Sequence, residues 1–181
     1  MLHVDVIVES DQWSAKLPEV EALVHRVAQA AIGAAPGVPG NAELSVLLSD
    51  DASVRRLNRD YRNRDEATNV LAFANDDPTS GTLADTRPTL LGDVVIAFET
   101  AAREAADQKK PLSHHVSHLL VHGVLHLLGY DHDEAAAAND MEDLERAILA
   151  GLGIPDPYGE RGPDEQPLAT ASGVAPYAQG L

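Results

Sequence analysis

The 181-residue sequence contains no cysteine. Disulfide bonds and cysteine-ligated zinc sites are therefore excluded. No apolar run approaches the roughly 20 residues needed to span a bilayer. The amino-terminal stretch also lacks the basic and apolar blocks of a secretory signal. These absences predict a cytoplasmic protein with neither a membrane partner nor a disulfide partner.

Basic residues are scarce, because 13 lysines and arginines face 29 acidic residues and the net charge is −16. Such a charge disfavours tight non-specific binding to nucleic acid. Half of the ten arginines nevertheless fall within ten residues of the chain. They form either a local basic patch or a solvated helix face, and they are Arg55, Arg56, Arg59, Arg62 and Arg64.

The segment 122–132 has the most informative spacing in the sequence. His122 and His126 are four residues apart, so on a helix their Cβ atoms lie roughly 5–6 Å apart on one face. Gly129 stands where a helix terminus favours a left-handed residue, which allows the chain to turn sharply. His132 follows this break and is therefore expected to come back toward the other two imidazoles.

Three imidazoles with one open coordination position are typical of a catalytic rather than a structural metal centre. We expect one zinc ion on His122, His126 and His132, although nickel, copper, iron or cobalt also suit nitrogen ligands. The alternative is three unrelated histidines. It leaves unexplained the apolar residues that surround them: Leu119, Leu120, Val124, Leu127 and Leu128.

The same segment matches the histidine and glycine offsets of the metzincin proteases, H-E-x-x-H-x-x-G-x-x-H. Gly123 occupies the position of the glutamate that serves as general base in zinc proteases. Glycine cannot transfer a proton, so a protease loses its main catalytic group. No other residue stands out as a general base.

Neighbouring residues are expected to support the ion rather than to bind it. His118 is eight residues from His126, about 12 Å along a helix, so we expect it to pack or to hydrogen-bond beside the ligands. Asp131 either orients a histidine or water next to the ion or simply caps the tight turn. His114 and His115, at the start of the helix, are expected on the surface.

Strand and helix patterns alternate along the chain and predict a single α/β domain of the α+β type. We expect one small mixed sheet of about four strands, flanked by helices, with the metal site on a central helix. The expected strands are 2–9, 43–48, 68–73 and 92–98, and the expected helices are 18–34, 51–61, 99–107, 112–128 and 133–149.

The domain is expected to cover residues 1–154, because the composition changes after that point. Residues 155–181 contain five prolines and four glycines. Such a segment buries little apolar surface and is predicted to be a disordered tail.

Three blocks of the sequence resemble the YbeY family of bacterial endoribonucleases, which act in ribosomal RNA maturation. The histidine block H-G-V-L-H-L-L-G-Y-D-H, 122–132, is the most specific of them. Residues 57–62 and 67–73 resemble the family segment LN-x-x-Y-R followed by p-T-[DN]-V-L-S-F. Residues 91–96 resemble its LGDI-x-I strand. Ala67 and Ala72 depart from the usual proline and serine, and neither departure removes a metal ligand.

The resemblance implies a zinc-dependent, single-strand-specific endoribonuclease that acts on the 3′ end of small-subunit ribosomal RNA and in ribosome quality control. Its partners are then RNA and the ribosome or ribosomal proteins. By motif match, Arg62 takes the place of the family's functional arginine, whose planar donor fork suits phosphate. Arg59 and Arg64 are candidates for further RNA contacts.

Two other functions remain compatible with the sequence. One is a non-catalytic ribosome-assembly factor in which the metal stabilises the fold, because an acidic chain is unusual for a nuclease. The other is a metal-dependent hydrolase of another class, such as a peptidase or amidase. That class requires a base to replace the absent glutamate.

Overall fold

The computed structural model describes residues 1–75, 87–131 and 134–159. Its strands and helices alternate along the chain as β1 (Leu2–Val8), α1 (Asp11–Lys16), α2 (Val20–Ala34), β2 (Ala42–Ser49), α3 (Asp51–Arg62), β3 (Val70–Ala74), β4 (Thr89–Ala97), α4 (Phe98–Asp107), α5 (Leu112–Leu127) and α6 (Ala135–Gly151). None of the helices in these ranges is long and apolar enough to cross a membrane.

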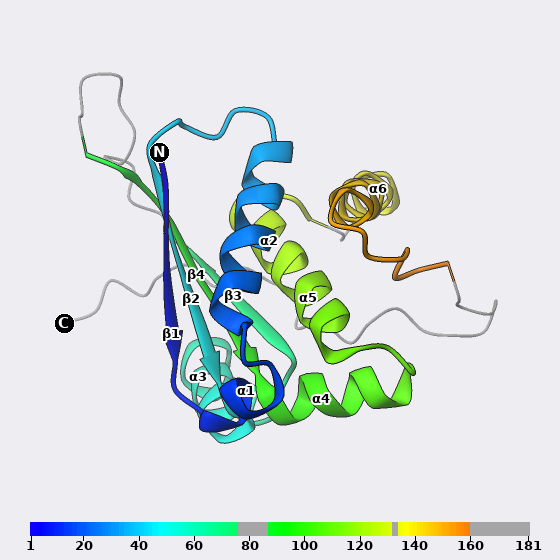
Figure 1. Ribbon diagram of the computed structural model, residues 1–181. Helices are drawn as coiled ribbons and strands as arrows, with labels where there is room; N and C mark the ends of the chain where they lie inside the picture. Colours follow the sequence, from blue (N-terminus) through cyan, green and yellow to red (C-terminus); the bar gives the residue numbers. More distant parts are fainter. Residues whose placement is uncertain (76–86, 132–133, 160–181) are drawn as a thin grey trace.

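The four strands form one sheet in the order β1-β2-β4-β3 (Figure 1). Strand β2 pairs in parallel with both β1 and β4, whereas β3 runs antiparallel to β4 and forms one edge. The predicted fold class, a small mixed sheet flanked by helices, is therefore confirmed.

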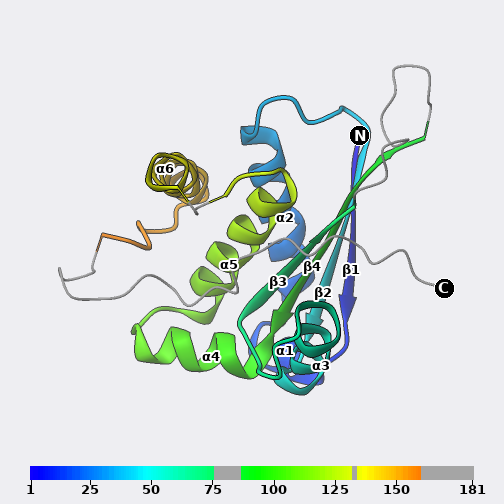
Figure 2. The same cartoon turned by 180° about the vertical axis from the view of Figure 1, so that it is seen from behind.

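The two faces of the sheet carry separate apolar clusters, because successive side chains of a strand point to opposite faces. On one face, Val70 and Val94 belong to the large core with α2 and α5. On the other, Leu71 and Phe73 pack with Val54 of α3. Figure 2 shows α3 and α5 on different sides of the strands. Helix α5, which carries the histidines, and helix α3, which carries most of the clustered arginines, therefore lie on opposite faces of the sheet.

Helix α5 is buried along most of its length, since 12 of its 16 residues are buried. It packs between the sheet, α2, α4 and α6. A helix that is buried on all sides positions its side chains firmly because close-packed neighbours limit their movement. The polar side chains on this helix must find partners inside the protein.

Helix α1 was not expected from the sequence. It has only six residues, too few for a clear helical repeat, and it is fixed by tertiary contacts. Trp13 is fully buried, and its indole Nε1 donates a hydrogen bond of 2.9 Å to the carbonyl of Ser49. Trp13 therefore anchors this short helix in the core.

Residues that follow the predicted domain boundary at 154 contact the rest of the structure. Pro157 is buried, and the Tyr158 hydroxyl donates a hydrogen bond to Glu145 of α6. Helix α6 ends in a turn at Gly153, whose φ is 75°, and the chain that follows stays in contact with the helix. Residues 160–181, the rest of the predicted tail, lie outside the described part of the structure.

Candidate metal centre

His122 and His126 meet through their Nε2 atoms, which lie 3.0 Å apart. Both residues are buried, with 8% and 6% of their surface exposed. Two nitrogens bound to one tetrahedral ion at 2.0–2.1 Å lie about 3.3 Å from each other. The two imidazoles therefore have nearly the separation that a shared zinc ion requires, and the donor set fits such an ion.

The chain leaves α5 through a sharp turn at Gly129, as its position in the sequence predicts. Gly129 has a φ of 90°, and its N–H donates to the carbonyl of His126. The N–H of Tyr130 donates to the carbonyl of Leu125, which completes a Schellman motif. Asp131, the next residue, is exposed.

His132, the third predicted ligand, lies outside the described residues. Across residues 1–75, 87–131 and 134–159, no three histidine, aspartate or glutamate side chains come together as a metal-ligand set. The described part of the centre is thus the histidine pair and the side chains that surround it.

Glu145 of α6 completes the surroundings of the pair, and sequence reasoning missed it. The residue is fully buried, and its Oε1 lies 2.6 Å from Nδ1 of His122. A signal was present in the sequence. Glu145 falls on the apolar stripe formed by Met141, Ile148 and Leu149, and an acidic residue on such a stripe needs a buried partner.

Glu145 remains ionised despite its burial. Burial by itself raises the pKa of a carboxyl group, but hydrogen bonds from His118 and His122 hold the pKa of Glu145 well below its usual range. Burial lowers the pKa of His118, and the neighbouring Glu145 offsets this only partly. His118 is therefore a neutral donor beside an anionic carboxylate.

The structure separates the histidines that flank the pair. His118 lies beside Glu145, with its Nε2 3.4 Å from Oε2 of that carboxylate. His115 is not on the surface as predicted, because it is 1% exposed and its Nε2 lies 2.7 Å from Glu104. Glu104 also accepts hydrogen bonds from Asn69, so this cluster connects α4, α5 and the start of β3.

Gly123, at the position of the metzincin glutamate, faces the sheet. A Cβ atom built there would lie 2.8 Å from Val94 Cγ1 and 3.3 Å from Val70 Cγ2. No side chain fits in this space, and least of all a carboxylate. The missing general base is therefore a consequence of how closely α5 packs on the sheet.

Two of the five clustered arginines pair with acidic neighbours. Arg55 makes two hydrogen bonds of 2.8 and 3.0 Å with Asp65, and Arg59 makes one of 3.0 Å with Asp60. Arg62 is more buried than these two arginines. Its burial lowers the pKa of the guanidinium, and the positive charge of Arg64 lowers that pKa further.

Burial distinguishes the arginines that pair with these carboxylates, Arg55 and Arg59, from Arg62. The paired side chains partly cancel the basic patch that their sequence cluster suggested, as expected of a solvated helix face. Arg62 differs because it is partly withdrawn from solvent near a second guanidinium.

A family model described as endoribonuclease YbeY matches residues 6–153. The chain belongs to the endoribonuclease YbeY family. The resemblance read from the three sequence blocks is confirmed, and it extends beyond them to nearly the whole described domain. The predicted enzyme class, an endoribonuclease, is confirmed as the class of this family.

Several curated relatives named endoribonuclease YbeY are similar over most of their length. The protein of Paramagnetospirillum magneticum is 50% identical over 160 residues, which are 88% of this chain and 98% of that protein. One from Rhodopseudomonas palustris is 50% identical over 157 residues, covering 87% and 90%. One from Rhodospirillum rubrum is 52% identical over 163 residues, covering 85% and 80%.

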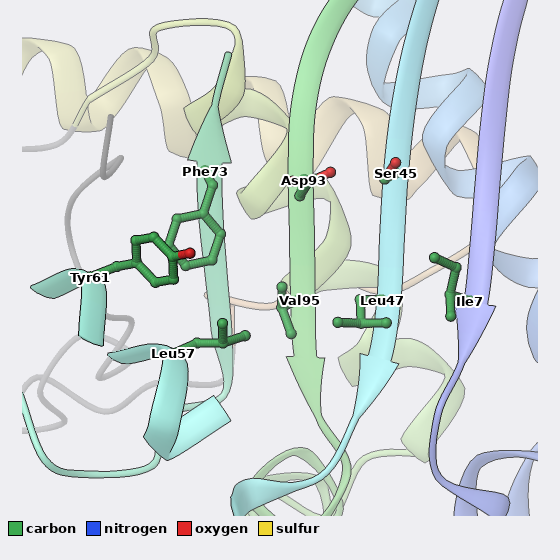
Figure 3. A pocket seen from close by; sticks show the side chains of 8 residues that line it. All are labelled: Ile7, Ser45, Leu47, Leu57, Tyr61, Phe73, Asp93 and Val95. Carbon is green, nitrogen blue, oxygen red and sulfur yellow. The ribbon is translucent and has the colours of Figure 1, made fainter. Parts of the chain in front are cut away.

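The YbeY domain of this chain also has a hollow of about 270 Å³ on the α3 face of the sheet. Apolar side chains of α3 and of all four strands surround it, with Ser45 and Asp93 on its floor (Figure 3). Tyr61 of α3, at its rim, is 48% exposed. The hollow lies across the sheet from His122 and His126 and does not belong to the histidine centre.

Proposed function

We propose that this chain is a zinc-dependent, single-strand-specific endoribonuclease. Its substrate is the 3′ end of precursor small-subunit ribosomal RNA, and it acts in ribosome biogenesis and quality control in the cytoplasm, in contact with the ribosome or its proteins. Membership in the endoribonuclease YbeY family supports the choice of RNA as substrate. The observation that carries the metal-dependent part is the 3.0 Å approach of the two histidine Nε2 atoms.

His122, His126 and His132 are the proposed ligands of one zinc ion, and another transition metal is compatible with the same nitrogens. When bound, the ion supplies Lewis-acid activation of water or of a phosphoryl oxygen. The buried surroundings of the pair exclude bulk water and strengthen electrostatic interactions with the substrate phosphate.

Arg62 is the proposed phosphate-binding residue, and Arg59 and Arg64 guide the RNA strand toward it. Arginine's planar fork can hold a phosphate with two parallel hydrogen bonds. Because α3 and α5 lie on opposite faces of the sheet, RNA that contacts both Arg62 and the histidines passes around the edge strand β3. Single-stranded RNA bends easily enough to follow such a path, which fits the proposed preference for single strands.

Asp131 has a supporting role in this proposal. It directly follows the Schellman turn and is next in sequence to the third proposed ligand. Its carboxylate would orient a ligand imidazole or the attacking water, as carboxylates beside metal-binding histidines commonly do.

Cleavage of a single-stranded RNA that carries the precursor 3′ end of the small-subunit RNA tests the proposal. We expect the wild-type protein and a His25→Ala variant to cut it. His25 is an exposed histidine of α2 and controls for the substitution itself. His126→Ala should lose cleavage. If His126→Ala cuts as fast as wild type, the histidine centre is not the nuclease site.

A second outcome favours the assembly-factor alternative. Wild-type protein that binds the precursor RNA with zinc present but never cuts it, in preparations free of other nucleases, would act by binding alone. Turnover of peptides rather than RNA would instead favour a hydrolase of another class.

A further inference from the structure

Glu145 is a charged side chain with no exposed surface, and it stands at the centre of a polar cluster inside the protein. It accepts hydrogen bonds from His122 Nδ1 at 2.6 Å, from His118 Nε2 at 3.4 Å and from the hydroxyl of Tyr158. A buried carboxylate is costly unless it is fully paired. These three donors from two other segments of the chain meet that need.

The short contact to His122 determines where that imidazole carries its proton. A neutral imidazole has one N–H, and an ionised carboxylate can only accept. His122 therefore donates through Nδ1, which leaves the lone pair on Nε2. That Nε2 lies 3.0 Å from Nε2 of His126. The lone pair thus faces the position where the two imidazoles converge.

Tyr158 holds the carboxylate from the other side, and its own ring is clamped. The guanidinium of Arg146 lies 5.0 Å from the centre of the Tyr158 ring, and its Nε donates to Asp156 at 3.2 Å. The backbone N–H of Tyr158 donates to the same Asp156 carboxylate at 2.8 Å. The turn after α6 therefore fixes the Tyr158 hydroxyl against Glu145.

We propose that Glu145 is the positioning residue of His122 and that Tyr158, clamped by Arg146 and Asp156, is the positioning residue of Glu145. Together they keep Nε2 of His122 unprotonated and directed toward His126, ready for a metal ion. This inference rests on the proposed function, because it concerns the same ion. The inference extends the proposed function to residues of α6 and of the following turn, which support the histidine ligand without binding the ion themselves.

The test measures zinc affinity of the full chain by competition with a chromophoric chelator, independently of RNA cleavage. We expect Glu145→Gln to weaken zinc binding about 10–100-fold, the range typical for loss of a partner of a metal-binding histidine. Tyr158→Phe should weaken it less, because it leaves the carboxylate in place. Asp140→Asn, which removes an exposed carboxylate from the same helix, should change nothing.

A second measurement needs no substitution and so does not depend on a variant that folds. Long-range ¹H–¹⁵N correlation spectra of the metal-free wild-type protein report the tautomer of each histidine. We expect His122 as the Nδ1–H form. The Nε2–H form, or wild-type zinc affinity in Glu145→Gln, would overturn the inference.

The two proposals fail in different ways. The proposed function is contradicted if the wild-type protein binds zinc tightly but does not cut RNA. The role of Glu145 is still supported in that case if Glu145→Gln binds zinc more weakly than wild type. Wild-type protein that cuts RNA but binds zinc equally well without the Glu145 carboxylate contradicts only the positioning role.

Discussion

Gly123 of α5 lies so close to Val94 of β4 that a methyl group at its Cα would come within 2.8 Å of Val94 Cγ1. The histidine helix reaches the sheet only because this position has no side chain. The same contact explains why the zinc-protease glutamate is absent from this otherwise similar histidine spacing. The catalytic difference between the two classes therefore coincides with a difference in packing.

We expect Gly123→Ala to lower the free energy of unfolding by about 1–3 kcal/mol, the usual cost of overpacking a core. Val94 is fully buried in the large core, so its neighbours must also shift if it moves. Urea denaturation followed by circular dichroism measures the effect.

Gly33→Ala is the matched control for this substitution. Gly33 lies in helix α2, and a Cβ built there meets nothing within 4 Å. This variant should be more stable than wild type by up to about 1 kcal/mol, because alanine favours the helix. Equal stabilities for both variants would contradict the close packing of Gly123.

Arg62→Ala tests the role of the half-buried arginine in RNA cleavage. We expect the rate to fall about 100-fold, comparable with the loss of one donor that stabilises transition-state charge. The zinc content should stay unchanged, because Arg62 belongs to α3 and the histidines to α5, and these helices pack on opposite faces of the sheet. Cleavage rates and metal analysis on one preparation measure both quantities.

Arg26→Ala, which removes an exposed arginine of α2, controls for the loss of one positive charge. It should cut RNA at nearly the wild-type rate. Full activity in Arg62→Ala would remove this arginine from the mechanism.

Asp50 caps helix α3, which carries Arg62 at its other end. Its side chain accepts a hydrogen bond of 2.8 Å from the N–H of Ser53, and this bond lowers the pKa of Asp50. We expect Asp50→Ala to cost about 1 kcal/mol of stability at pH 7. Thermal or chemical denaturation gives the value directly.

The pH dependence follows from the direction of that shift. A carboxyl group with a lowered pKa in the folded state stabilises the protein above its unfolded pKa of about 3.9. The contribution is lost as the pH falls through the lower, folded value. Asp50→Asn keeps a good cap without the charge, so its stability should approach that of wild type as the pH falls. A constant difference down to acid pH would contradict the ionised cap.

Much of the fold follows from local patterns in the sequence. The helix cap at Asp50, the turn at Gly129 and the buried strands were predictable because each depends on a few neighbouring residues. Helix α1 and the inward position of His115 were not, because Trp13 and Glu104 fix them through contacts made far along the chain. Tyr61 follows the apolar repeat of α3 and its ring lies edge-on against Phe73, yet 48% of the residue is exposed.

The candidate site also has one part that the sequence predicts and one part that it does not. The spacing of His122 and His126 predicts their convergence, since both lie on one helix face. Glu145 approaches His122 only when α6 packs on α5, 23 residues further along the chain. No spacing rule links Glu145 to His122. The one indication in the sequence is that Glu145 lies on the apolar stripe of α6.

The most direct test is RNA cleavage by the full-length, untagged protein after removal and return of the metal. We expect chelation to remove one zinc ion per chain and to abolish cleavage, and one equivalent of zinc to restore it, with His126→Ala inactive throughout. Chelated protein that is still folded and cuts RNA at the original rate would show that the histidine centre does not perform the reaction.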